Sequence, residues 1–224
     1  MQSLNRYIEL KGITLSYGSR TILKDVNLML NRGDFMLVYG ANGGGKTSLI
    51  KIMLGLQKPT QGEVLYYGGR ADSVVKRGEN IGYLPQKNTL DMSFPMSIRE
   101  VVESGLMGVG NSMTKAEKQN RVMAMLQDMQ LDTLQNRHIG EVSGGQFQRA
   151  LFARSIISSP TLLVLDEPTS YLDEEFTGKL FATLKQLSPQ TTVVAVLHDT
   201  SKVVDIANRK IEVENGVVDR KSVV

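Results

Sequence analysis

A glycine-rich loop constrains the fold of this chain more than any other feature. Residues 40–47 read Gly-Ala-Asn-Gly-Gly-Gly-Lys-Thr, which fits the phosphate-loop pattern G-x-x-x-x-G-K-[ST]. An apolar run at 35–39 precedes the loop, and residues 48–54 after it have the apolar spacing of a helix. Strand, glycine loop and helix form the setting that this motif requires. The sequence therefore predicts an α/β core with a cradle for nucleotide phosphates; the alternative is a glycine-rich turn without a ligand.

The chemistry of this phosphate loop follows from its backbone and its last two residues. Successive N–H groups, together with the start of the following helix, form an anion-binding concavity. Lys46 is expected to reach the β- and γ-phosphates, and the hydroxyl of Thr47 to ligate Mg²⁺. Glycines allow a polyphosphate to lie against the backbone. The residues predicted to bind the nucleotide here are Gly40, Asn42, Gly43, Gly44, Gly45, Lys46, Thr47 and Ser48.

Composition excludes several classes of protein. The 224 residues include 26 Lys and Arg against 23 Asp and Glu, and these charges are scattered along the chain, so we expect no nucleic-acid partner. The chain has no cysteine, and therefore neither a disulfide framework nor a thiolate metal site. No apolar run approaches the ~18 residues of a membrane span. We expect a cytoplasmic chain that meets a membrane through a partner.

The chain is expected to be a single domain in which a helical subdomain interrupts an α/β core. Two continuous apolar runs, 161–165 and 192–197, are typical of central parallel strands, and residues 174–187 between them have a helical pattern. Capping-box patterns begin at Ser97 and at Thr114, each with a glutamate three residues later. The predicted core covers about 1–87 and 158–224, and the predicted helical insertion covers about 88–157.

Two carboxylates follow the first of these apolar runs. Asp166 and Glu167 are predicted at the strand's carboxyl end, where open α/β sheets bind ligands. We expect Asp166 to hold Mg²⁺ and Glu167 to polarise the water that attacks the γ-phosphate. His198 follows the second run and could hold that water in line or bond the γ-phosphate. The alternatives are a strand end with solvated carboxylates and an ordinary histidine capped by Asp199.

A second segment has the features of an anion-binding helix start. Ser143, Gly144, Gly145 and Gln146 precede a helical pattern at 147–157. Serine is a good N-cap, and the glycines allow a phosphate to approach the helix N-terminus. The alternative is a plain loop-to-helix cap.

Together these segments resemble the ATP-binding subunit of ATP-binding-cassette (ABC) transporters, over nearly the whole chain. Residues 142–146 are similar to the signature L-S-G-G-Q, with Val in place of Leu, and lie about 20 residues before Asp166. The resemblance implies that Tyr17 stacks on adenine and that Gln86 senses Mg²⁺ and the attacking water. It also implies that residues 170–173, Ser-Tyr-Leu-Asp, form a loop that crosses a dimer interface.

The resemblance implies a fold and a mode of action. The fold is a P-loop NTPase core with a parallel sheet, an antiparallel β subdomain and the inserted helical subdomain. Two copies meet head to tail, and ATP lies between the phosphate loop of one copy and the Ser143 segment of the other. Further partners are integral membrane permease subunits and, indirectly, a substrate-binding protein, at the cytoplasmic face of the membrane. The implied catalytic residues are Lys46, Gln86, Glu167 and His198; the implied metal-site residues are Thr47, Gln86 and Asp166; and Ser143, Gly144, Gly145 and Gln146 are implied at the nucleotide.

Besides Val142, the chain departs from the family pattern in the phosphate loop and in the 170–173 loop. In the phosphate loop Ala41 replaces the usual proline, Gly44 replaces the usual serine, and Thr47-Ser48 inverts the usual Ser-Thr, which keeps a hydroxyl at each position. Tyr171 replaces a small residue in the 170–173 loop.

The stretch 85–102 is similar to cassettes of the zinc/manganese import group, so we expect a transition-metal importer whose residues 87–107 face a permease. The alternatives are an iron-chelate or cobalamin importer, and a soluble ABC ATPase without a permease, such as one serving iron–sulfur assembly.

Overall fold

The computed structural model describes residues 6–66, 69–70, 80–86, 92–109, 112–197 and 205–221. The chain divides into two compact units. The first unit comprises Met1–Glu79 and Leu184–Val224, and the second comprises Asn80–Thr183. Antiparallel strands, parallel strands and helices all occur, so the chain is mixed α/β, as predicted from the sequence.

The first unit contains a four-stranded antiparallel sheet in the order β2-β1-β4-β5. In the β1–β2 pair, Leu10 lies opposite Leu28 and both side chains are buried. Apolar residues alternate with exposed ones along both strands, as expected of a sheet with one buried face. The strands are β1 (Arg6–Tyr17), β2 (Arg20–Asn31), β4 (Gln61–Tyr66) and β5 (Gly69–Arg70).

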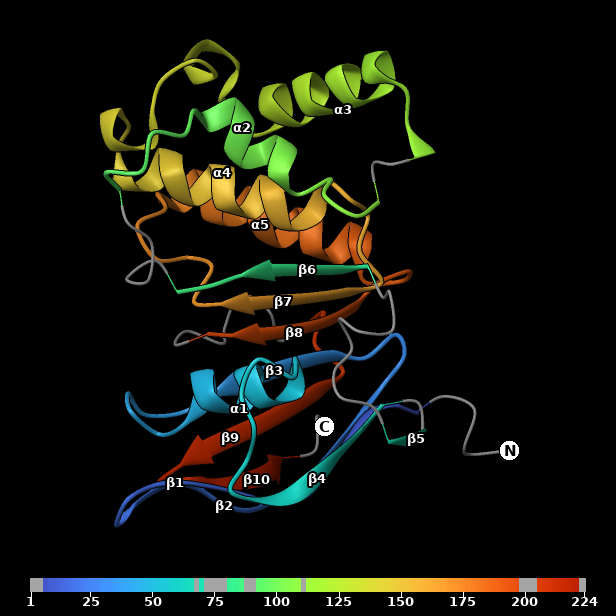
Figure 1. Ribbon diagram of the computed structural model, residues 1–224, viewed down its shortest axis with the longest axis vertical. Helices are drawn as coiled ribbons and strands as arrows, with labels where there is room; N and C mark the ends of the chain where they lie inside the picture. The colour runs from blue at the N-terminus through green and yellow to red at the C-terminus, as the bar shows by residue number, and fades with distance from the viewer. Residues whose placement is uncertain are drawn as a thin grey trace. The chain divides into compact units, whose positions relative to one another are not determined.

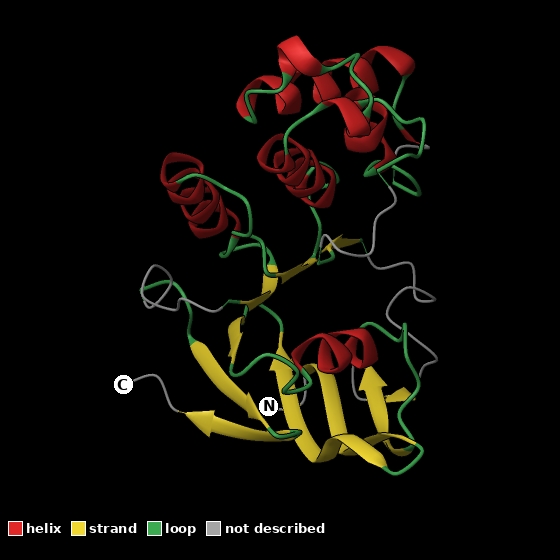
Figure 2. Cartoon of the chain, turned by 90° about the vertical axis from the view of Figure 1, so that its left-hand side faces the viewer, coloured by secondary structure: helices red, strands yellow, loops and turns green. Residues whose placement is uncertain are grey.

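The same unit holds a second ladder in the order β10-β9-β3-β8. Here β3 (Phe35–Tyr39) is parallel to both β8 (Thr192–Val196) and β9 (Arg209–Glu214), and β10 (Val217–Lys221) is antiparallel to β9. Almost every residue of β3 and β8 is buried, which explains their continuous apolar sequences. Helix α1 (Lys46–Met53) follows β3 and lies among the strands of this unit (Figure 2).

The second unit pairs two parallel strands with helices. Strands β6 (Ile81–Leu84) and β7 (Leu162–Asp166) run side by side. Helix α4 packs against β6 on one side and against α2 on the other (Figure 1). The helices are α2 (Ile98–Ser104), α3 (Lys115–Asp128), α4 (Gly144–Ile156) and the part of α5 (Glu174–Leu187) that precedes Leu184, with 3-10 turns η4 (Asp132–Leu134) and η5 (Ile139–Glu141).

Both predicted capping boxes are present. The hydroxyl of Ser97 accepts from the backbone N–H of Glu100 at 3.2 Å, and the Glu100 carboxylate accepts from the Ser97 N–H at 2.8 Å. Thr114 and Glu117 repeat this pattern at the start of α3. The bond from the Ser97 N–H lowers the pKa of the Glu100 carboxyl, because it favours the ionised form. None of the helices in the described ranges is long and apolar enough to cross a membrane.

Candidate functional site

The phosphate loop joins β3 to α1, which is the predicted setting. Lys46 is the first residue of α1 and is only 6% exposed. Its Nζ donates to the carbonyl oxygens of Gly40 at 2.8 Å and of Ala41 at 2.9 Å, so the ammonium group lies against the loop. Gly45 precedes α1 with a φ of 107° and makes no side-chain cap. The first backbone N–H groups of α1 have no side-chain cap and lie next to a buried ammonium group, so both can donate hydrogen bonds to the oxygens of a phosphate.

Three of the loop glycines, Gly40, Gly44 and Gly45, are also required by the packing of the protein itself; a Cβ on Gly45 would lie 2.9 Å from the carbonyl oxygen of Ile22. A Cβ on Gly40, whose φ is 135°, would lie 2.1 Å from the carbonyl oxygen of Val213 in β9. A Cβ on Gly44 would lie 2.8 Å from the same oxygen. By contrast, Gly43 has open space where its Cβ would be, although its φ is 74°. The close approach of Val213 therefore gives a reason for glycine at position 44, where the family usually has serine.

The remaining predicted residues of the first unit differ in exposure. Tyr17 ends β1 and is 61% exposed, and its hydroxyl accepts a hydrogen bond from the side chain of Gln57. The Asn42 side chain is exposed, whereas Thr47 and Ser48, in the first turn of α1, are half-buried. The accessible ring of Tyr17 can take a stacking partner.

In the second unit, the parallel pairing of β6 and β7 brings three predicted residues to one edge. Leu84 lies opposite Leu165 in the register of this pair. Gln86 comes two residues after Leu84, and Glu167 comes two residues after Leu165. Asp166 is the last residue of β7, and its side chain is buried. Glu167 has a φ of 54°, in the left-handed region that non-glycine residues rarely adopt. Such strain at a strand end is common at functional sites.

The electrostatics of this edge depend on Asp166. Burial raises the pKa of the Tyr83 phenol to about 12, and the nearby negative charge of Asp166 contributes to the rise. Burying a carboxylate is costly unless hydrogen bonds or a cation compensate its charge. Mg²⁺ prefers carboxylate and hydroxyl oxygens, so Asp166 fits the predicted role as a metal ligand.

The Ser143 segment begins α4 and forms part of a hollow. The Ser143 hydroxyl accepts from the Gln146 N–H at 3.2 Å, and the Gln146 side chain accepts from the Ser143 N–H at 2.9 Å. The helix therefore starts at Gly144, three residues earlier than the apolar pattern indicates. The adjoining space, called the Ser143 hollow below, measures about 460 Å³. Its lining residues are Gln130, Ser143, Gly144, Gly145, Gln146, Arg149, Tyr171 and Asp173.

Sequence reasoning missed two of these lining residues, Gln130 and Arg149. Arg149 donates to the side-chain oxygen of Gln130 at 3.0 Å and to the Asp173 carboxylate at 2.9 Å. The available signal for Arg149 was its spacing, since it follows Gln146 by three residues and therefore lies near it on the surface of α4. Gln130 carried no such signal, because it lies in the turn after α3.

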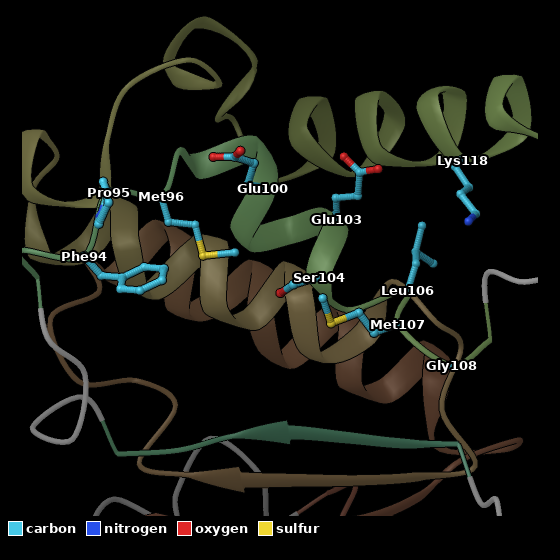
Figure 3. A pocket seen from close by; sticks show the side chains of 10 residues that line it. All are labelled: Phe94, Pro95, Met96, Glu100, Glu103, Ser104, Leu106, Met107, Gly108 and Lys118. Atoms are coloured by element: carbon cyan, nitrogen blue, oxygen red, sulfur yellow. The ribbon is translucent and has the colours of Figure 1, made fainter.

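A second hollow of the same unit, called the Phe94 hollow below, lies beside α2 (Figure 3). Its volume is about 580 Å³. Phe94 and Met107 are 60% and 81% exposed, and carboxylates of Glu100 and Glu103 accompany these apolar side chains. The other lining residues are Pro95, Met96, Ser104, Leu106, Gly108 and Lys118. Residues 87–91 of the predicted permease-facing segment lie outside the described residues, as does His198.

Comparisons with known proteins agree on one family. A family profile described as ABC transporter matches residues 23–170. The zinc import ATP-binding protein ZnuC of Haemophilus influenzae is 34% identical over 200 residues, which cover 88% of this chain and 68% of that protein. The spermidine/putrescine import ATP-binding protein PotA of Aggregatibacter actinomycetemcomitans is 34% identical over 214 residues, covering 94% and 56%. A solved dimeric structure of the ATP-binding cassette MJ0796, in a post-hydrolysis state bound to ADP and Pi, has a TM-score of 0.85 at 28% identity and covers 97% of this chain and 99% of that one.

Proposed function

We propose, from the premise that this chain belongs to the ABC transporter family, that it is the ATP-hydrolysing subunit of a transition-metal importer and acts as a head-to-tail dimer. ATP hydrolysis and ATP binding follow from membership of the family. Importers are also the class named for its curated relatives. The substrate, the geometry of the dimer and the roles of individual residues belong to the proposal.

One observation carries the dimeric mechanism: the chain has two separate features suited to phosphate. The first is the loop around Lys46, which presents an ammonium group and an α-helix start. The second is the Ser143 hollow, where two glycines and a capped helix start line a polar space of about 460 Å³. In a two-fold dimer, each copy can supply one feature to each of two equivalent ATP molecules.

The proposed chemistry assigns one task to each predicted residue. Lys46 binds the β- and γ-phosphate oxygens, while Thr47 and Asp166 hold Mg²⁺, which would neutralise charge that develops on the phosphates. Glu167 takes a proton from the attacking water. Gln86 and His198 orient that water and the γ-phosphate. Support for this set comes from the buried carboxylate of Asp166 and the strained backbone of Glu167.

The proposed cargo is zinc or manganese, and the metal passes through the permease without touching this chain. Support comes from the 85–102 stretch and from the zinc import protein among the relatives. A polyamine import protein has the same identity to this chain, so polyamine is the competing cargo. Import of an iron chelate or of cobalamin also competes with this assignment, as does a soluble ATPase that works without a permease.

We propose that the Phe94 hollow receives a cytoplasmic loop of the permease. Support comes from the two exposed apolar side chains, Phe94 and Met107, because large exposed apolar groups that cluster at a hollow are typical of protein contacts. The carboxylates of Glu100 and Glu103 favour a permease loop with lysine or arginine beside its apolar residues (Figure 3).

A growth experiment tests the proposed cargo. The gene is deleted in its host, and growth is followed under limitation of zinc, of manganese and of iron, and without external polyamine. We expect a defect under limitation of zinc or of manganese that addition of the same metal reverses. A plasmid copy of the gene should also reverse the defect, whereas its Lys46→Ala variant should not. A defect confined to polyamine or iron starvation would replace the cargo, and normal growth in every arm would oppose import.

A further inference from the structure

Arg149 makes three contacts at the wall of the Ser143 hollow. One guanidinium nitrogen donates to the side-chain oxygen of Gln130 at 3.0 Å, and another donates to the Asp173 carboxylate at 2.9 Å. The guanidinium also lies over the ring of Phe176, 4.3 Å from its centroid. Only 17% of the Arg149 side chain is exposed. A planar group with forked donors and an aromatic partner is held in one orientation, which a lysine could not reproduce.

The partners of Arg149 belong to segments that are distant in the sequence. Gln130 lies in the turn after α3, and Asp173 is the last residue of the 170–173 loop. The Asp173 carboxylate accepts a hydrogen bond from the backbone N–H of Phe176, in the first turn of α5, at 2.7 Å. That N–H, together with the charge of Arg149, lowers the pKa of the Asp173 carboxyl and so keeps it ionised. Arg149 therefore links α4 to the ends of two other elements through charged hydrogen bonds.

The 170–173 loop lies directly against the turn formed by Ser143, Gly144, Gly145 and Gln146, called the Ser143 turn below. The carbonyl oxygen of Tyr171 is 2.8 Å from the point where a Cβ on Gly145 would stand. Tyr171 has a φ of 67° and Gln130 a φ of 57°. Both residues line the hollow, and left-handed backbone at bulky side chains persists only where surrounding contacts hold it. The Arg149 bonds are contacts of this kind.

We propose that Arg149 is a positioning residue for ATP hydrolysis. Its guanidinium holds the 170–173 loop and Gln130 around the Ser143 turn, so the hollow keeps the shape that receives the triphosphate carried by a second copy. This inference rests on the proposed dimeric function. Because Arg149 joins α4 to the 170–173 loop, the Ser143 turn and that loop move together as one rigid wall of the hollow.

The test compares Arg149→Met with Arg149→Lys and with a matched control, Arg121→Met. Arg121 also links α3 to the end of α4 with two bonds, to the Ile157 carbonyl and the Ser159 hydroxyl, but it does not line the hollow. We expect R149M to lower kcat/KM for ATP by about tenfold or more, as is typical when charged hydrogen bonds are lost, and R149K to fall between R149M and the wild type. Binding of a fluorescent ATP analogue to the isolated chain should remain unchanged, because the phosphate loop is complete. R121M should keep normal kcat/KM even if it lowers the Tm.

Mixing experiments separate this inference from the proposed dimer. R149M mixed with Lys46→Ala should regain activity, because the intact phosphate loop of R149M then meets the intact hollow of K46A. Rescue of a Ser143→Ala/K46A mixture without rescue of R149M/K46A would overturn the role of Arg149 in the hollow. Failure of both mixtures would overturn the dimer and this inference together.

A double-mutant cycle gives a second measurement that does not need mixing. Asparagine is a good helix cap, so Asp173→Asn removes the charge of residue 173 while keeping its cap on α5. We expect R149M/D173N to be no more impaired in kcat/KM than R149M alone, because both changes remove the same interaction. Losses that simply multiply would contradict a joint action of Arg149 and Asp173.

Discussion

The backbone of Gly44 lies so close to the carbonyl oxygen of Val213 that a Cβ on Gly44 would stand 2.8 Å from that oxygen. The same segment is held by a hydrogen bond from the Gly216 N–H to the Gly44 carbonyl, at 3.2 Å. The phosphate loop is therefore supported by β9 and by the turn between β9 and β10. Its shape depends on a part of the chain about 170 residues away in the sequence.

We expect Gly44→Ala to destabilise the protein by about 1–3 kcal/mol, because the added methyl group must displace backbone. Gly178→Ala is the matched control: Gly178 lies within α5, has no atom within 4 Å of its Cβ position, and should gain up to ~1 kcal/mol from the higher helix propensity of alanine. Chemical denaturation of both variants measures the difference. Equal stability of G44A and the wild type would show that Val213 can move away without cost.

Glu167→Gln should bind ATP, hydrolyse it about 10²–10⁴-fold more slowly and accumulate as an ATP-bound dimer, because only the proton acceptor is lost. Phosphate release gives the rate, and size-exclusion chromatography with light scattering gives the oligomeric state. Lys46→Ala is the control, and it should neither hydrolyse ATP nor dimerise with it. Near-normal turnover by E167Q would show that another group accepts the proton.

The Ser143 hollow should act on ATP bound by the other copy. Lys46→Ala and Ser143→Ala should each be inactive alone, whereas an equimolar mixture should regain activity in the mixed dimers, which hold one complete site each. Steady-state ATPase assays over a range of mixing ratios measure this rescue. Absence of rescue at every ratio would place both residues in the same site of one chain.

A cysteine in the Phe94 hollow should crosslink to a membrane protein. The chain has no cysteine of its own, so Met107→Cys introduces a single reactive thiol at a position that is 81% exposed. Gln127→Cys, exposed on α3 and outside the lining of the hollow, is the control. Mass spectrometry of crosslinks formed in membranes identifies the partner. Crosslinks from position 107 that reach only soluble proteins would contradict docking of a permease.

Alkaline pH should destabilise the fold through Tyr66. This residue of β4 is 1% exposed, and burial raises its pKa from 10.0 to about 12. Between pH 10 and 12 the unfolded chain loses the phenolic proton while the folded chain retains it, so stability falls as the pH rises through this range, by roughly 2 kcal/mol. Tyr66→Phe should remove that part of the decline in urea titrations. An unchanged slope in Y66F would assign the decline to other groups.

Features that depend on neighbours in the sequence were predicted correctly. The capping boxes at Ser97 and Thr114 formed because each needs only a hydroxyl and a glutamate three residues apart. The buried strands β3 and β8 match the apolar runs that predicted them. Where a cap competes with the apolar pattern, the cap sets the boundary, and α4 therefore begins at Gly144. The roles assigned to the site residues, His198 among them, stay predictions.

The sequence by itself determined the local motifs of the chain: a glycine-rich loop between a strand and a helix, two carboxylates at the end of a buried strand, and a second glycine-rich helix start with a serine cap. Each of these is a short run of residues whose meaning depends on spacing alone. Tertiary structure decided which distant residues complete them. Val213 lies against Gly44, strand pairing sets Leu84 opposite Leu165 just before Gln86 and Glu167, and Arg149 bonds Asp173. No local pattern specifies these contacts, because strand pairing and side-chain packing between separate elements create them only once the chain has folded.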